Sequence, residues 1–380
     1  MKKILFISTR NPYSRRFSGD VIGSLKIINF LKKKYSLNVV TISKEKIKDK
    51  KNILFFDQPN FFFKLFYVLL SLIKMKPLQF GLFHSKKMKK YIQLNAKNYD
   101  LLFFYHIRSS QYLPKNYKGR TVIEMGDLYS HNYSQTSCNL GTLNPLKYIY
   151  FIESFLIKKI EKNIFMNFDK IILFSKNEIA KINKIFKKKI FNINLSVDLI
   201  HNKFSFSKKN NRIIFIGNLG YLPNLLAVKD FIKSILPSLR KKIPNIEFYV
   251  IGNISKINKF FLSFYKNVIF VGQQQSIRNY MKNSFCGLAN LKVATGVQGK
   301  VLTYMSYGLP VICSNKVSPN FKNNVINYNN NNELIKKIIN LKNNKKLSEK
   351  FSKNSLAFVR RLKSNKISLK YLKIVNFNKN

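Results

Sequence analysis

Short apolar runs alternate with helical patterns along most of this 380-residue chain. Lys3–Ser8 is built around an apolar run typical of a buried strand, Val21–Leu31 has apolar residues at helical spacing, and Leu37–Ile42 has the pattern of a second strand. A strand, a helix and a strand in this order form a right-handed crossover unit, which requires a parallel sheet. A second alternation of strands and helices begins with the strand pattern at Arg212–Gly217. We therefore predict an α/β protein with two domains, each built on a parallel sheet.

The residues between the two series have neither a helical nor a strand period. Asp198–Asn211 is polar and basic, which is typical of a linker between domains. We therefore predict a first domain over residues 1–200, a linker over residues 201–211 and a second domain over residues 212–345. Residues 346–380 are basic with a helical pattern and are expected to form a tail.

One segment of the second domain has the features of an anion site. Thr295–Gly299 is a loop of small residues, Lys300–Met305 has helical spacing, and Gly308 stands where that helix would end. Leu309–Cys313 then has the pattern of a short buried strand. Free N–H groups at the start of a helix suit a phosphate, and Lys300 adds a cation beside them. The alternatives are a tight turn without a ligand and a lysine whose head stays in water.

Two stretches of the second domain carry a resemblance to a known family. Ile214–Asn224 has the sequence I-F-I-G-N-L-G-Y-L-P-N, and Gly296–Val311 has the sequence G-V-Q-G-K-V-L-T-Y-M-S-Y-G-L-P-V. Both resemble the donor-binding domain of GT-B glycosyltransferases, especially retaining family 4 and its sugar-transferase relatives in exopolysaccharide clusters. The resemblance implies two facing Rossmann-like domains with a cleft between them, the donor on the second and the acceptor on the first. It also implies that a C-terminal helix, here Leu347–Leu362, crosses back to the first domain.

The same resemblance assigns donor-binding residues. It places them on the two glycine-bearing loops and the helix that follows the second one. They are Gly217, Asn218, Thr295, Gly296, Gln298, Gly299, Lys300 and Thr303. Charge on the leaving diphosphate would be met by Lys300 and backbone N–H groups, so no metal and no cofactor are expected, and the nucleotide-sugar is a substrate.

The chain departs from the family at both of its glutamates. Thr303 stands where the family's glutamate holds the ribose of the nucleotide, and Thr295 stands at the earlier position, eight residues before. Two hypotheses follow. One is an enzyme that transfers a hexose-type unit from a nucleotide-sugar to a glycolipid or polysaccharide, with retention. The other is a non-catalytic GT-B protein with a binding or scaffolding role.

Candidate residues in the first domain follow predicted strands. His106 follows the strand Asp100–Tyr105, and Asp127 ends the strand that starts at Val122. Ligands meet the carboxyl ends of strands in open α/β sheets, so both are candidate catalytic residues, although a lone histidine is often structural. The loop Thr9–Gly19 corresponds to the family's mobile N-terminal loop.

In that loop Arg10 and Gly19 are candidates for contacting phosphate or acceptor, and Arg15 and Arg16 add positive charge. A basic loop that is merely solvated explains the same residues equally well.

A further apolar run, Phe61–Ile73, contains one lysine. Its thirteen residues are fewer than the roughly 20 that cross a bilayer. We predict a buried core helix. The alternative is an interfacial helix lying on a bilayer, flanked by lysines that begin at Lys74 and Lys76.

The net charge of +53 raises the question of an anionic partner. Lysine, asparagine, isoleucine and phenylalanine are all frequent and tryptophan is absent, as expected when AT-rich codons accumulate, so part of the charge needs no partner. A nucleic-acid binder ranks last among the interpretations, because no basic and aromatic platform motif is present. The remaining charge favours anionic donors and an anionic membrane surface. Three scattered cysteines favour a reducing compartment, so we expect a cytoplasmic protein, peripheral on the inner face of the membrane.

Overall fold

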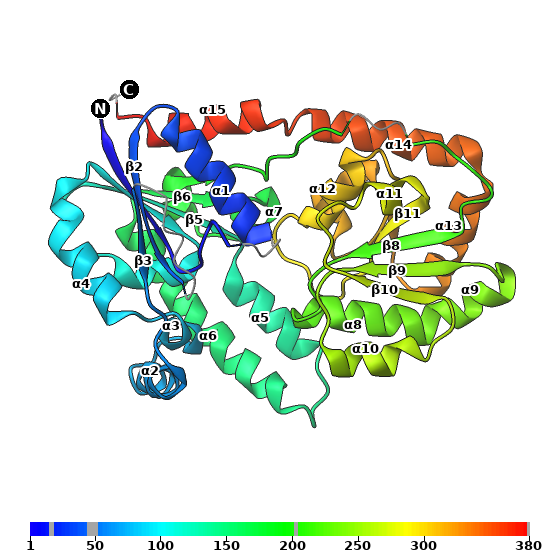
Figure 1. Cartoon of the computed structure of the whole chain (residues 1–380), viewed down its shortest axis with the longest axis horizontal. Helices are drawn as coiled ribbons and strands as arrows, with labels where there is room; N and C mark the ends of the chain where they lie inside the picture. Colours follow the sequence, from blue (N-terminus) through cyan, green and yellow to red (C-terminus); the bar gives the residue numbers. More distant parts are fainter. Residues whose placement is uncertain (15–18, 44–51, 201–203, 378–380) are drawn as a thin grey trace. The chain divides into compact units, whose positions relative to one another are not determined.

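The computed structural model describes residues 1–14, 19–43, 52–200 and 204–377. The chain forms two compact units, Met1–Asn194 with Ile367–Asn380 and Leu195–Lys366 (Figure 1). Each is an α/β unit with a parallel sheet, as predicted. Arg15, Arg16 and the first three residues of the predicted linker lie outside the described residues. The cleft expected between facing domains stays a prediction.

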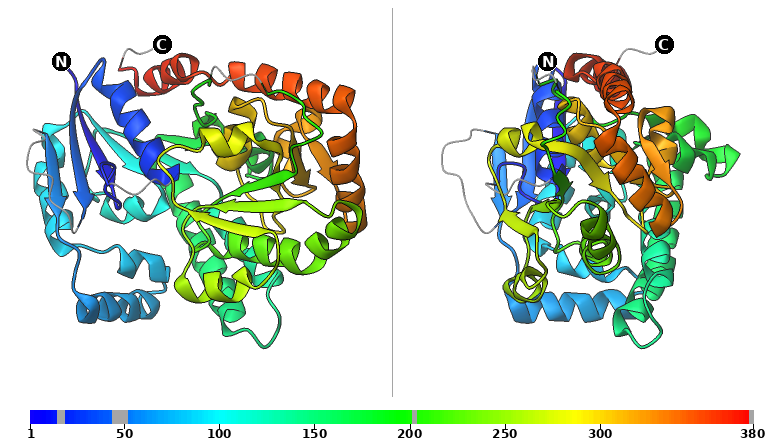
Figure 2. Two further views of the ribbon diagram at one scale, coloured as in Figure 1. Left: turned by 45° about the vertical axis from the view of Figure 1, so that its right-hand side comes forward. Right: turned by 90° about the vertical axis from the view of Figure 1, so that its right-hand side faces the viewer.

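The first unit is built on a parallel sheet with helices on both faces (Figures 1 and 2). Its described strands have the order β3-β2-β1-β4-β5-β6-β7. They are β1 (Lys3–Ser8), β2 (Ser36–Ile42), β3 (Ile53–Phe56), β4 (Leu101–Tyr105), β5 (Arg120–Gly126), β6 (Lys170–Leu173) and β7 (Ile190–Asn192). The helices are α1 (Gly19–Lys32), α2 (Phe61–Ile73), α3 (Leu78–Leu82), α4 (Lys86–Asn95), α5 (Tyr129–Cys138), α6 (Pro145–Asn167), α7 (Lys176–Ala180) and α15 (Ser364–Val375).

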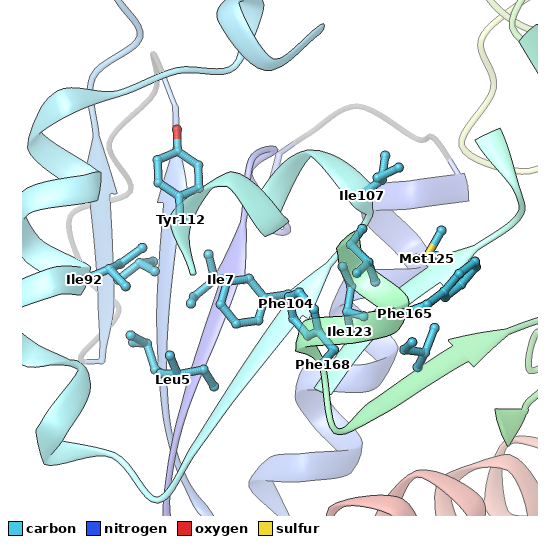
Figure 3. Close-up of a cluster of buried hydrophobic side chains, with 14 of the residues drawn as sticks. Leu5, Ile7, Ile92, Phe104, Ile107, Tyr112, Ile123, Met125, Phe165 and Phe168 are labelled. Carbon is cyan, nitrogen blue, oxygen red and sulfur yellow. The ribbon is translucent and has the colours of Figure 1, made fainter. Parts of the chain in front are cut away.

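The core of this unit lies between the sheet and its helices (Figure 3). Leu5 and Ile7 of β1 and Phe104 of β4 are fully buried, which explains why these strands are continuous apolar runs. Phe104 packs edge to face on Phe168, with ring centroids 5.1 Å apart. Ile92 of α4 joins the same cluster.

The second unit repeats the architecture. Its described strands have the order β10-β9-β8-β11-β12-β13. They are β8 (Arg212–Ile216), β9 (Glu247–Ile251), β10 (Val268–Gly272), β11 (Ser284–Ala289), β12 (Val311–Ser314) and β13 (Ile326–Tyr328). The helices are α8 (Leu222–Asp230), α9 (Leu236–Lys242), α10 (Lys256–Ser263), α11 (Arg278–Lys282), α12 (Gly299–Ser306), α13 (Asn331–Asn343) and α14 (Lys345–Arg360).

Strand order reverses once in each sheet, and in open α/β sheets such a reversal is a common place for ligands to bind. In the first unit the reversal lies between β1 and β4, and in the second between β8 and β11. Loops that leave neighbouring strands in opposite directions open a crevice at the carboxyl ends of those strands. The predicted site residues follow these strands and their neighbour β5.

The last two helices differ from the prediction. The predicted crossing segment, Leu347–Leu362, forms most of α14, which stays with the second unit and packs on α12. The helix that belongs to the first unit is α15, from Ile367 onward. The division before the second unit also falls earlier than predicted, at Asn194 and Leu195. The helical pattern does not distinguish α14 from α15, because both are amphipathic, and only their contacts assign them.

The prediction that Phe61–Ile73 is a buried core helix was wrong. The helix forms with the predicted bounds, but Ser71 is its one buried residue. Phe62 is 79% exposed and Ile73 is 78% exposed.

Candidate functional site

The loop after β8 is packed so closely that its backbone requires glycine. A side chain at Gly217 would lie 2.8 Å from the Asn224 amide nitrogen, and one at Gly252, after β9, would lie 2.0 Å from the Gly217 carbonyl oxygen. Gly252 has φ +142°, which also favours glycine. The resulting turn brings the backbone of Gly217 and Asn218 to the carboxyl end of the sheet, at the reversal of strand order.

Asn224, in the first turn of α8, joins this loop to α12. Its amide nitrogen donates to the Asn218 carbonyl at 2.9 Å. Its amide oxygen accepts from the Lys300 ammonium at 2.7 Å. One buried side chain therefore fixes the predicted loop residue Asn218 and the predicted cation Lys300 together.

Lys300 is held in an unusual environment for a lysine. Its ammonium lies 3.9 Å from the centre of the Phe215 ring, and no carboxylate pairs with it among the residues that the structure describes. Burial lowers the pKa of Lys300 to about 7. The alternative of a head group left in water is wrong. The ammonium lies at the strand ends, where an anion would restore its charge.

The loop before α12 leaves the start of that helix without a side-chain cap. Gly296 has φ +62°, and its carbonyl accepts from Asn320 at 2.6 Å. Gln298, the residue before the helix, donates its side-chain amide to the Thr295 carbonyl at 2.9 Å and does not cap the helix. The first N–H groups of α12, beginning at Gly299, are therefore placed to bind an anion.

The two threonines that replace the family's glutamates differ in their surroundings. Thr303 is half-buried on α12, and its hydroxyl donates to the Gly299 carbonyl of the same helix at 3.0 Å. Thr295 is buried in the loop before the helix. Thr303 therefore lies one turn beyond the start of the anion site, at a position open enough for a longer side chain.

Residues of the first unit gather at the equivalent reversal in its sheet. Arg10, just after β1, forms an ion pair with Asp20 in the first turn of α1, which begins at the predicted residue Gly19. The Tyr105 hydroxyl, at the end of β4, donates to the Asp20 carbonyl at 2.9 Å. The predicted loop residues Arg10 and Gly19 are thus adjacent to the end of the strand that precedes His106.

His106 and Asp127 both lie next to Tyr129, the first residue of α5. The Tyr129 hydroxyl is 3.1 Å from His106 Nδ1. Burial, and to a smaller extent the charge of Asp127, raises the pKa of Tyr129. Burial, then the charge of Arg108, lowers the pKa of His106 to about 4, so the imidazole is neutral at neutral pH. Burial raises the pKa of Asp127 to about 7, and its buried Oδ1 has no hydrogen-bond partner among the residues that the structure describes. His106 also has φ +64°, a strained backbone for a non-glycine residue.

Sequence reasoning did not single out Asn224 or Tyr129. Asn224 closes the Ile214–Asn224 segment, but an asparagine at a helix start is expected to act as a cap. Tyr129 follows a strand end by three residues, which was a weak signal. Their contacts to Lys300 and His106 join residues far apart in the chain.

Two features of the described residues concern metals and membranes. No group of three or more His, Cys, Asp or Glu side chains is placed to hold a metal ion within the described ranges. In the same ranges no helix is both long and apolar enough to cross a membrane.

Comparison with known proteins agrees with this architecture. Residues 210–344 match the family described as Glycosyl transferases group 1. The chain is 25% identical over 272 residues to an uncharacterized 44.6 kDa protein in the cps region of Klebsiella pneumoniae. That match covers 67% of this chain and 65% of the relative, which is just under two thirds of the relative's length.

Three solved structures share the whole fold. Sucrose-phosphate synthase from Thermosynechococcus elongatus has a TM-score of 0.73 at 14% identity, covering 98% of both chains. HepE from Anabaena, in complex with UDP and glucose, has a TM-score of 0.70 at 13% identity, covering 100% of both. WaaG, a glycosyltransferase involved in lipopolysaccharide biosynthesis, has a TM-score of 0.65 at 14% identity, covering 99% of this chain and 100% of WaaG.

These likenesses define the class of protein by its fold. The chain has the GT-B fold, with two parallel-sheet α/β units. Its second unit, which contains Lys300 and Asn224, matches the group 1 glycosyl transferase family over residues 210–344, a range that contains all the described strands of its sheet.

Proposed function

We propose that the chain transfers a hexose-type sugar from a nucleotide-sugar to a glycolipid or polysaccharide acceptor in cell-envelope glycan synthesis. The second unit binds the donor and the first unit binds the acceptor. Retention of the anomeric configuration is part of the proposal, through the resemblance to retaining family 4. Two proteins of similar structure support the proposal of sugar transfer in glycan synthesis: HepE was solved with UDP and glucose, and WaaG is involved in lipopolysaccharide biosynthesis.

The observation that carries the proposal is the setting of Lys300. Its ammonium is fixed by Asn224 beside the uncapped start of α12 and the glycine loop after β8. When the bond between the sugar and the diphosphate breaks, negative charge grows on the diphosphate. A cation held away from water stabilises that charge more strongly than it stabilises the bound donor, which lowers the barrier. Backbone N–H groups of Gly299 and Lys300 supply further donors.

The first unit contributes the proton acceptor. The acceptor hydroxyl attacks the anomeric carbon on the same face from which the diphosphate departs, as retention requires. The bond between the anomeric carbon and the diphosphate oxygen breaks, and the hydroxyl proton passes to the Asp127 carboxylate. A carboxyl whose pKa is about 7 suits this role, because it is both basic and partly ionised near neutral pH. Neutral His106 and the Tyr129 hydroxyl orient the acceptor.

A second candidate is a GT-B protein that binds a nucleotide-sugar without turning it over. Thr303 favours it, because its hydroxyl is engaged by its own helix and offers no charged acceptor for a ribose. Binding without release of free nucleotide is the expected signature of that protein.

Incubation with a panel of nucleotide-sugars distinguishes the two candidates. The sequence and the site leave the base and sugar of the donor open, so the panel varies both. The proposal predicts that one donor releases free nucleotide faster when a glycolipid extract is added. Binding of a donor without release, with or without the extract, supports the non-catalytic candidate, and binding of none contradicts both.

A further inference from the structure

Helix α2 presents large apolar side chains to solvent over most of its surface. Among its residues are the aromatic side chains Phe61, Phe62, Phe63 and Phe66, each more than half exposed, and the exposed residues Leu65, Leu69, Leu72 and Ile73. Exposed apolar surfaces of this size are rare on proteins that have no partner for them.

The helix is held firmly on one side, so its exposure is a feature of the fold. A side chain at Gly81 of α3 would lie 2.4 Å from the Tyr67 carbonyl of α2, which shows how closely the two backbones approach. The Tyr67 ring also packs on His84, with centroids 4.6 Å apart.

The start of α6 carries further exposed apolar residues. Leu143, just before α6, is 99% exposed, and Phe151 and Phe155 are 66% and 65% exposed. α6 is tied to α2 through α3, because the Leu78 amide of α3 donates to buried Glu153 of α6. Beyond Phe155 most exposed residues of α6 are polar: Lys158, Lys159, Lys162, Asn163 and Asn167, with Met166 as the exception.

The segment that contains α2 carries positive charge without any acidic residue. The sequence contains no aspartate or glutamate between Asp57 and Asp100, a segment that includes all of α2, α3 and α4. The exposed lysines there are Lys74, Lys76, Lys86, Lys87, Lys89 and Lys90. Lys74 and Lys89 are close enough to Lys76 to lower its pKa, after the larger effect of burial.

We propose that α2 and the amino-terminal half of α6 dock onto an anionic lipid bilayer, with α2 lying in the interface. The exposed aromatic side chains enter the acyl boundary and the lysines contact anionic head groups. At about 1.5 Å per residue, α2 is about 20 Å long, shorter than the roughly 30 Å hydrocarbon core, so it lies along the surface rather than crossing.

A second copy of the chain fits this surface less well. In a symmetric dimer the same patch would face itself, so the lysines of one copy would meet those of the other. The chain has a net charge of +53, which opposes such pairing, whereas an anionic bilayer complements it. The proposal concerns where the protein acts and does not depend on its chemistry.

Sedimentation with lipid vesicles tests the proposal. The wild type is expected to bind vesicles of phosphatidylcholine mixed with phosphatidylglycerol, and to bind them less as salt rises. The pair Phe62→Ser and Phe66→Ser is expected to weaken binding by at least about tenfold, because each phenylalanine loses its burial in lipid. The matched control is Phe260→Ser with Phe261→Ser on α10, where both side chains are similarly exposed.

The outcomes of the sedimentation experiment either support or overturn docking on the bilayer. Selective loss of binding in the α2 pair, with an unchanged circular dichroism spectrum, supports the proposal. Absence of wild-type binding to anionic vesicles overturns it, and so does equal loss in the α10 control. A dimer in solution that the α2 substitutions dissociate, without vesicle binding, also overturns it. Donor binding measured without lipid is expected to be unchanged in the α2 pair, so failure here is distinct from failure of the proposed function.

Discussion

Lys300 combines a charged side chain with surroundings that oppose its charge. Burial is the main cause of its low pKa, and Asn224 satisfies one of its N–H groups without neutralising it. The pKa of Lys300 in the free protein is about 7, so its ammonium form predominates only below that pH. A bound diphosphate would favour the charged form and raise that pKa.

Nucleotide-sugar binding is expected to depend on pH for this reason. The diphosphate of a nucleotide-sugar stays ionised across the neutral range, so Lys300 is the group that titrates. Affinity should be full below a pH of about 7 and fall above it, approaching tenfold per unit, because binding then requires uptake of a proton. Calorimetric titration of UDP-glucose or the preferred donor from pH 6 to pH 9 measures this. Affinity that does not change over that range would show that Lys300 does not contact the diphosphate.

Thr303→Glu should tighten donor binding. The position is half-buried on α12, and a carboxylate there would offer the ribose hydroxyls a charged acceptor in place of a hydroxyl bonded to its own helix. Hydrogen bonds to charged groups contribute about 1.5–3 kcal/mol, so affinity should rise about tenfold or more. Thr303→Gln serves as the uncharged control. Weaker binding by the glutamate variant would mean that the ribose lies elsewhere.

The sequence singled out residues where a backbone motif marks them. The loop Thr295–Gly299 and Lys300 were proposed as an anion site because glycines and a helix start have local signals, and that role stays a prediction. Asn224 was not found, because its role depends on a contact with a residue 76 positions away, Lys300. The pKa values of His106 and Asp127 depend on burial in the folded unit, which local sequence does not determine.

At the scale of elements, α15 is attached to the first unit by a buried polar contact. The Tyr371 hydroxyl donates to Glu124 of β5, and both side chains are buried. Lys170 and Arg120 donate to carbonyls near the end of α15, at Ile374 and Asn376. Burial raises the pKa of Glu124 to about 8, so its carboxyl is protonated at neutral pH.

Stability should therefore fall as pH rises. The folded pKa of Glu124 lies above its ordinary value of 4.5, so its contribution is complete below about pH 4.5 and is lost as pH rises through about 8. Glu124→Gln removes the ionisation and keeps an acceptor for Tyr371. Its urea unfolding midpoint should decline less between pH 5 and pH 9 than that of the wild type. The unfolding midpoint of Asp127→Asn, measured over the same pH range, is the comparison, because burial also raises the pKa of Asp127.

Equal declines in wild type and Glu124→Gln would contradict this account of the α15 contact. Tyr371→Phe leaves buried Glu124 without its hydroxyl partner, and it should cost about 1–3 kcal/mol of unfolding free energy.

Element type was easier to predict than element burial. The strand Lys3–Ser8 has the predicted bounds, because an apolar run is a local property. The short edge strands β3, β7 and β13 were not predicted, since three or four residues carry too little pattern. The burial of Phe61–Ile73 was predicted wrongly, because a core helix and an interfacial helix have the same apolar composition.

At the scale of the whole molecule, the alternation of strand and helix was sufficient to predict two parallel-sheet units. Their boundaries depend on which helix packs where, and for this reason the crossing segment was placed in α14 and not in α15. The first sequence stretch that resembled GT-B proteins, Ile214–Asn224, and the second, Gly296–Val311, both lie at the reversal of strand order in the second sheet. The resemblance was therefore specific where a ligand is expected to bind.

The central claim, that Lys300 binds the diphosphate of a sugar donor, is tested most directly by donor titration of three proteins. They are the wild type, Lys300→Met and Lys292→Met, the last removing a nearby lysine that pairs with Asp230 on the surface. The account predicts at least about tenfold weaker donor binding for Lys300→Met, the loss of one charge-assisted contact, and little change for Lys292→Met. Equal effects of the two substitutions would contradict it, because bulk charge would then explain the binding.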